Sequence, residues 1–124
     1  MTIKSILQHC HNEGFKEDEI YGAYKIFFGT LVSESRLKII NLLRGGIKNV
    51  SELMVELKMD QTAVSHDLKR LKKCGFVSSE RDGKFVYYSL NNEFIRPLMD
   101  LIERHMGNYC IHILRGIKGG NNES

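Results

Sequence analysis

The stretch from Asp60 to Gly75 constrains this chain more than any other, because its residues fall on two distinct faces at helical spacing. One face is apolar and consists of Ala63, Val64, Leu68 and Leu71. The other carries short polar groups followed by cations, and consists of Gln61, Thr62, Ser65, His66, Lys69 and Arg70. Short side chains can approach base edges in a major groove while the cations behind them reach phosphates. The polar face is therefore a candidate DNA-reading surface, although a solvated amphipathic helix would show the same pattern.

The sequence before this stretch indicates two further helices. Ser33 can cap one of them, which Gly45-Gly46 would end, and Ser51 can cap a short helix over residues 51–57. Met59-Asp60 then forms a brief turn into the helix of residues 61–74. Two helices joined by a turn of a few residues, the second with a polar and basic outer face, predict a helix-turn-helix.

After Gly75 the apolar period changes from about four residues to two, which is typical of strands. Two β-prone runs, residues 76–81 and 84–90, are joined by Asp82-Gly83, a dipeptide suited to a two-residue hairpin turn. Arg81 and Lys84 flank the tip and should contact the DNA backbone, adding affinity more than sequence preference. The predicted fold is mainly α with a β-hairpin wing (α+β), a winged helix-turn-helix.

The two ends of the chain carry apolar helices. Residues 1–13 predict a short helix or arm, and residues 17–31 predict a helix with a wide aromatic face. Because proline is disfavoured inside a helix, the final helix should begin near Pro97, and its two apolar faces should cover the domain and a partner. We expect one domain over residues 1–124: arm and dimerisation helix (1–31), winged core (33–90), C-terminal dimerisation helix (91–117) and tail (118–124).

Charge and composition narrow the range of functions. Residues 61–84 hold six Lys and Arg against three acids, whereas the rest of the chain holds twelve of each, so the basic surplus lies on the candidate DNA element.

No run is long enough to span a membrane and the N-terminus lacks the apolar core of a signal peptide, so we expect a cytoplasmic protein without membrane contact. Three cysteines without a close pair argue against a disulfide scaffold, and no nucleophile–base pair or phosphate loop indicates an enzyme.

Residues 30–90 resemble the ArsR/SmtB family of winged-helix repressors. The resemblance rests on five motifs: 33–43 (SESRLKIINLL), 50–53 (VSEL), 61–71 (QTAVSHDLKRL), 75–77 (GFV) and 82–90 (DGKFVYYSL). It implies a homodimer built on the first and last helices and binding to an imperfect inverted-repeat operator in double-stranded DNA. It also implies release from DNA by an inducer, often a metal ion.

The metal-binding motifs of that family are largely missing here. Its thiolate motif Glu-Leu-Cys-x-Cys corresponds to residues 52–56 (ELMVE), and of a second, zinc-type site only His105 is present. Other soft and imidazole ligands near both termini suit zinc, cadmium or copper and could meet across a dimer: His9, Cys10, His11, His105, Cys110 and His112. No cofactor is required. A zinc-like ion as effector is one hypothesis, thiol oxidation at Cys10 or Cys110 is another, and a protein-binding winged helix without DNA binding is a third.

Overall fold

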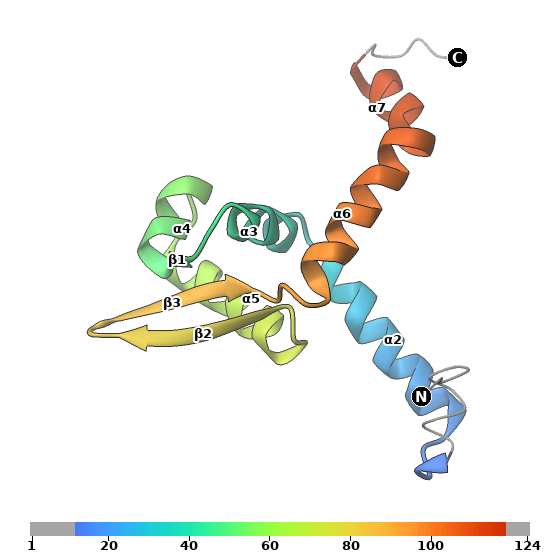
Figure 1. The fold of residues 1–124 in the computed structure, drawn as a ribbon, viewed down its shortest axis with the longest axis horizontal. Coiled ribbons are helices and arrows are strands. Elements are labelled where there is room, and N and C mark those ends of the chain that lie inside the picture. Colours follow the sequence, from blue (N-terminus) through green and yellow to red (C-terminus); the bar gives the residue numbers. More distant parts are fainter. Residues whose placement is uncertain (1–11, 119–124) are drawn as a thin grey trace.

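The computed structural model describes residues 12–118, in which helices lie beside a small three-stranded sheet whose β2–β3 hairpin projects from the domain (Figure 1). In chain order the elements are α2 (Glu17–Leu31), α3 (Glu34–Arg44), β1 (Lys48–Asn49), α4 (Val50–Leu57), α5 (Gln61–Lys73), β2 (Val77–Asp82), β3 (Phe85–Leu90), α6 (Ile95–His105), the π-helical turn η1 (Met106–Cys110) and α7 (Ile111–Lys118). The predicted winged helix-turn-helix is confirmed, with α4 and α5 as its helices and β2–β3 as its wing. The predicted arm of residues 1–13 lies outside the described residues, apart from Asn12 and Glu13.

One hydrophobic core joins α3, α4, α5, the sheet and the start of α6. Its buried members are Ile39, Ile40, Leu43, Leu53, Val64, Leu68, Leu71, Phe76, Val77, Leu90, Ile95 and Met99. Phe76 follows Gly75, whose φ of +79° is the left-handed conformation in which helices commonly end. The Phe76 ring stacks on Phe27 of α2 with 5.1 Å between centroids. The core therefore takes the apolar side of α5 and leaves its polar side outside.

Asn49, rather than Ser51, caps α4. The Asn49 side chain accepts a hydrogen bond from the backbone N–H of Glu52 at 2.8 Å, and the Glu52 carboxylate accepts one from the N–H of Asn49 at 2.8 Å. This reciprocal pair is a capping box. The prediction of a Ser51 cap was wrong because only Asn49 has a carboxylate three residues later, whereas Ser51 has Met54 at that position.

The turn between α4 and α5 is held by backbone conformation and by a second cap. Lys58 ends α4 in the left-handed conformation with φ of 56°, which reverses the chain within three residues. Asp60 then accepts a hydrogen bond from the N–H of Ala63 at 2.8 Å and so fixes Gln61 as the first residue of α5. The predicted brief turn is confirmed, and it places the start of α5 at the protein surface.

The sheet that contains the wing has one strand more than predicted. β2 and β3 pair antiparallel from Val77↔Leu90 to Asp82↔Phe85, and Gly83 at the tip has φ of +66°, as a tight hairpin turn requires. β1 adds to the other side of β3, so that the strand order is β1-β3-β2. A strand of two residues is too short to show alternation, so this pairing left no signal in the sequence. It ties the residues before α4 to the wing.

The last helix starts earlier than predicted and is not continuous. α6 begins at Ile95, so the expected start near Pro97 was wrong. Pro97 is the third helical residue, where a backbone N–H would have no acceptor within the helix and its loss costs nothing. The Asn91 side chain accepts from the N–H groups of Glu93 and Phe94, both at 3.0 Å, and so starts the turn. The π-helical turn η1 then separates α6 from α7.

α2 and α6–α7 leave the core in different directions (Figure 1). Both carry large apolar side chains that are exposed: Tyr21, Tyr24, Ile26 and Phe28 on α2, and Leu101, Met106, Tyr109, Ile113, Leu114 and Ile117 on α6–α7. No helix within residues 12–118 is both long and apolar enough to cross a membrane. These two faces are therefore uncovered apolar surfaces of a helical domain.

An ion-pair cluster braces α6 against α3. The guanidinium of Arg44 contacts the carboxylates of Asp100 and Glu103, the latter at 2.7 Å. The hydrogen bond from Arg44 lowers the pKa of Glu103 below its ordinary value, because it favours the charged carboxylate. Beside this cluster, α3 and α6–α7 enclose an apolar groove of about 540 Å³ that includes Leu37 and Met99.

Candidate nucleic-acid interface

The outer face of α5 presents five of the predicted DNA contacts together. They recur at steps of one, three or four residues and are all exposed: Gln61, Thr62, Ser65, His66 and Lys69. On the opposite face Val64, Leu68 and Leu71 have no exposed area. The helix therefore cannot rotate about its axis without exposing these apolar side chains to water. The orientation of the polar face is therefore set by packing rather than by the polar residues themselves.

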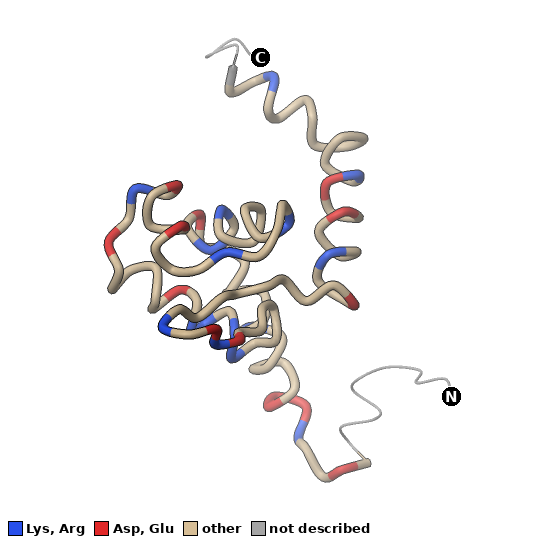
Figure 2. Tube along the Cα trace, turned by 60° about the vertical axis from the view of Figure 1, so that its left-hand side comes forward, with Lys and Arg blue, Asp and Glu red and all other residues tan. Residues whose placement is uncertain are grey.

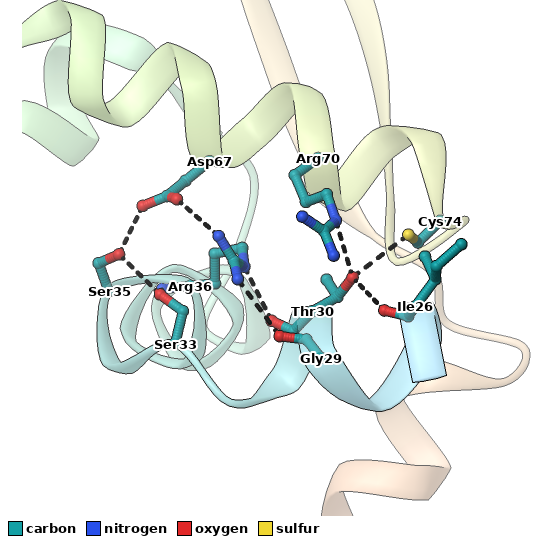
Figure 3. Close-up of polar contacts among 9 residues, drawn as sticks. All are labelled: Ile26, Gly29, Thr30, Ser33, Ser35, Arg36, Asp67, Arg70 and Cys74. Atoms are coloured by element: carbon teal, nitrogen blue, oxygen red, sulfur yellow. Dashed lines mark hydrogen bonds and ion pairs between the residues drawn. The ribbon is translucent and has the colours of Figure 1, made fainter. Parts of the chain in front are cut away.

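Arg70 does not lie with these five residues. It is half-buried, and its Nε donates a hydrogen bond to the Thr30 hydroxyl of α2 at 3.1 Å (Figure 3). A position one residue after Lys69 is turned by about 100° around the helix axis. The structure thus brings Lys69 to the outer surface and Arg70 to the contact between α5 and α2.

The wing brings two further predicted contacts to its tip. Both side chains are exposed: Arg81 lies in β2 just before the tip, and Lys84 is the second residue of the hairpin turn itself. Arg81 donates a hydrogen bond to the carbonyl of Gly83 at 3.4 Å, and the Lys84 ammonium lies 5.5 Å from the centre of the Phe85 ring. Both cationic groups are exposed to solvent, where a phosphate could reach them. Figure 2 shows Lys and Arg interspersed with acids along the wing and α5.

α5 and the wing meet at a surface hollow of about 410 Å³. It is lined by Asn49, Val50, Ser51, Met54, Gln61, Lys84, Phe85 and Val86. Gln61, the first residue of α5, and Lys84, at the wing tip, lie at this one hollow although the sequence separates them widely. A residue predicted to approach bases and a cation predicted to bind the DNA backbone therefore line the same hollow.

Sequence reasoning did not assign Lys72 and Lys73 to the site, although both are exposed. Lys72 donates a hydrogen bond to the Ser79 hydroxyl of β2 at 2.6 Å, so it links the end of α5 to the wing. Their spacing of three and four residues from Lys69 places both on the outer face, and this spacing was the available signal. They extend the basic end of that face by one turn.

Histidine and cysteine side chains do not gather into a metal site in the part of the chain that is described. Across residues 12–118 no three His, Cys, Asp or Glu residues lie where they could hold one ion. His105 and His112 are exposed, Cys110 is half-buried, and the His105 ring lies 4.9 Å from that of Tyr109. The remaining predicted ligands, His9, Cys10 and His11, lie outside the described residues.

A family model described as bacterial regulatory protein, arsR family, matches residues 33–79, which cover α3 to the start of the wing. The transcriptional repressor SdpR of Bacillus subtilis is 32% identical over 69 residues, a match that covers 56% of this chain and 77% of SdpR. The chain belongs to the ArsR family. This winged-helix regulator is not an enzyme, as predicted, since the relatives are transcriptional regulators.

Two other relatives of this ArsR-family protein match over less of their length. NmtR of Mycobacterium tuberculosis is 39% identical over 70 residues, which cover 56% of this chain and 58% of NmtR. CadC of Listeria innocua, a cadmium resistance regulatory protein, is 40% identical over 76 residues, which cover 60% of this chain and 64% of CadC. The chain thus matches about three fifths of each of these two regulators.

Solved structures show the same fold over most of the described chain. A homodimeric winged helix-turn-helix DNA-binding domain from Mycobacterium bovis has a TM-score of 0.69 and 23% identity, and covers 88% of this chain and 93% of that one. NolR from Sinorhizobium fredii has a TM-score of 0.63 and 23% identity, and covers 88% and 97%. Because both structures are only 23% identical to this chain in sequence, their similarity shows a shared fold.

Proposed function

We propose that this ArsR-family regulator binds an inverted-repeat operator as a homodimer and represses transcription until an effector releases it. The observation that carries the proposal is the outer face of α5, where every exposed residue is polar or charged and where Gln61 lies at the same hollow as the wing cation Lys84. Gln61, Thr62, Ser65 and His66 would contact or approach bases, and Lys69, Arg81 and Lys84 would hold phosphates. Arg70 is left out because its guanidinium is bonded to Thr30.

Dimerisation is supported by the two apolar helices that leave the core. On α2, Tyr24 stacks on Phe28 with 6.5 Å between centroids, and both rings are more than one third exposed. Aromatic residues exposed in one patch are typical of protein–protein contacts. An inverted repeat matches the two-fold symmetry of a homodimer, so each chain would contact one half-site.

A protein-binding role for α5 is less well supported. Interfaces between proteins depend on a few buried aromatic or aliphatic anchors, and the exposed residues of α5 include none. The apolar side chains that are exposed lie mainly on α2 and α6–α7, which are the proposed dimer helices.

The division of roles on α5 can be tested by separate substitutions. We expect Lys69→Ala to weaken binding to all DNA sequences about equally and to lower the slope of log affinity against log salt by about 1, because one phosphate contact is lost. Gln61→Ala and Ser65→Ala should instead reduce the preference for operator over random DNA by about 1 kcal/mol or more each. Fluorescence anisotropy over a range of salt concentrations measures both quantities.

Lys38→Ala is the matched control for these variants, because Lys38 is an exposed cation of α3 whose ion pair is with Glu34, an exposed residue of the same helix. It should leave affinity and salt slope unchanged. Unaltered operator affinity in Lys69→Ala, Gln61→Ala and Ser65→Ala together would refute the assignment of α5 as the recognition helix.

A zinc-like ion is the effector that we propose for test. Since residues 12–118 do not hold a site by themselves, the ligands would have to include His9, Cys10 or His11, together with His105, Cys110 or His112. Zinc should then release the regulator from DNA and slow alkylation of Cys10, whereas magnesium, which prefers oxygen ligands, should do neither. Equal labelling of Cys10 with and without saturating zinc would exclude this site and make thiol oxidation the next hypothesis to test.

A further inference from the structure

The last turn of α2 is held by two arginines that come from other helices (Figure 3). Arg36 of α3 donates hydrogen bonds to the backbone carbonyl of Thr30 at 2.8 Å and to that of Gly29 at 3.3 Å. Arg70 of α5 donates to the hydroxyl of Thr30 at 3.1 Å. Thr30 has no exposed area, and its hydroxyl also donates to the Ile26 carbonyl at 2.8 Å. We call this arrangement the α2 clamp.

The α2 clamp continues directly into the recognition helix. Arg36 also pairs with Asp67 of α5, with 3.2 Å between Nη1 and Oδ1, and these side chains are only 14% and 9% exposed. The second carboxylate oxygen of Asp67 accepts a hydrogen bond from the Ser35 hydroxyl at 2.6 Å. One guanidinium therefore joins the end of α2, the start of α3 and the middle of α5.

The chemistry of a helix C-terminus explains why an arginine at this position restrains the angle between α2 and α5. The last carbonyls of a helix have no partner within the helix and carry partial negative charge, and the last turn of α2 contains no basic residue of its own. A guanidinium satisfies such carbonyls with donors in a rigid planar fork, whereas a lysine ammonium is a point charge on a flexible stem. Because Arg36 binds α2 and α5 through the same plane, it restrains the angle between the two helices.

That angle matters if α2 is part of the dimer interface. A partner that packs on Tyr24 and Phe28 fixes the position of α2, and the α2 clamp then fixes the position of α5 relative to the partner's α5. We propose that Arg36 and Arg70 are positioning residues that set the angle between α2 and α5, and thereby the half-site spacing that a dimer accepts. This inference rests on the proposed function as an operator-binding homodimer.

The experiment begins with DNA that the unaltered protein selects from a library of random duplexes. From the selected duplex, versions are made with one base pair added to or removed from the spacer, which turns one half-site by about 35° relative to the other. Affinity for each is measured for the unaltered protein, for Thr30→Val and for Arg36→Lys. Valine preserves the shape of Thr30 and removes only its hydroxyl, and lysine keeps the charge of Arg36 without the fork. Lys38→Ala is the control within α3.

We expect the unaltered protein and Lys38→Ala to lose about tenfold or more in affinity when the spacing changes. For Thr30→Val and Arg36→Lys, the same change of spacing should reduce affinity by about threefold or less. Their affinity for random DNA should equal that of the unaltered protein. A role limited to stability would lower the folded fraction and affect every duplex equally, so the ratio between spacings separates positioning from stability.

Folded Thr30→Val protein with the full spacing penalty of the unaltered protein would overturn the inference, whatever Arg36→Lys does. If Arg36→Lys does not fold, Thr30→Val alone decides, because it leaves every charge in place. Selected DNA without two related half-sites would instead refute the proposed function, at a stage before any variant is used.

Discussion

Phe28→Glu is expected to convert the proposed dimer into monomers and to lower operator affinity by at least about 100-fold. Phe28 is 58% exposed on α2 and stacks on Tyr24, so the substitution leaves the core of a single chain intact. A carboxylate buried without a partner at the centre of an interface costs several kcal/mol, about 3 or more. Each tenfold change in affinity corresponds to about 1.4 kcal/mol. Analytical ultracentrifugation measures the oligomeric state, and anisotropy with operator DNA measures the affinity.

Val55→Glu is the matched control for the oligomeric state. Val55 is 77% exposed on α4, so the variant introduces the same charge at an exposed apolar position outside α2. It should sediment as the unaltered protein does. Phe28→Glu protein that stays dimeric at micromolar concentration would show that α2 is not in the interface, so the α2 clamp could not set the half-site spacing.

Asp67→Ala is expected to be the most destabilising of the polar substitutions considered for this chain. The substitution leaves Arg36, 14% exposed, without its carboxylate, and a buried ion pair that loses one partner costs about 3–5 kcal/mol. The double variant Arg36→Met with Asp67→Leu should recover part of that loss, because no charge is left buried, but not all of it, because the carbonyls of Gly29 and Thr30 lose their donor. Urea unfolding at a fixed protein concentration measures the free energy of unfolding of each variant.

The exposed pair between Lys38 and Glu34 provides the comparison for Asp67. These side chains are 60% and 84% exposed, so Lys38→Ala should change the free energy of unfolding by about 0.5 kcal/mol or less. An Asp67→Ala variant as stable as Lys38→Ala would mean that the Arg36 guanidinium finds water or another acceptor, and that the α2 clamp does not depend on Asp67.

The elements that the sequence predicted correctly are those with a repeated local signal. The helix of residues 17–31 has the predicted bounds because its apolar residues recur over four turns, and Ser33 caps α3 as expected by accepting from the N–H of Arg36 at 3.3 Å. The predicted hairpin is present, but its two turn residues are Gly83 and Lys84 rather than Asp82 and Gly83, because Asp82 still pairs with Phe85. In each case the deciding interactions lie within about four residues, where periodicity and capping residues report them.

The features that the sequence did not predict depend on contacts between distant residues. β1 is two residues long and exists only because β3, about forty residues later, pairs with it. Arg70 belongs by composition to the basic face of α5, and only the position of Thr30 shows that it points elsewhere. Asp67 lies among polar residues in the sequence but is 6% exposed, because Ser35 and Arg36 satisfy it. Such tertiary partners carry no local pattern.

The π-helical turn η1 changes which residues of α7 share a face with those of α6. A π turn holds one residue more than an α turn, so everything after it is turned by about 100° relative to an uninterrupted α-helix. The groove beside α3 is lined by Met99 and Ile102 before the turn, by Met106 at its first residue, and by Ile111 and Leu114 after it. The turn therefore places Ile111 and Leu114 on the groove face, where an uninterrupted α-helix of the same sequence would place Cys110 and Ile113. Removing one residue from η1 would restore a regular helix and keep the apolar stripe, whereas a regular helix of the present length would lose it.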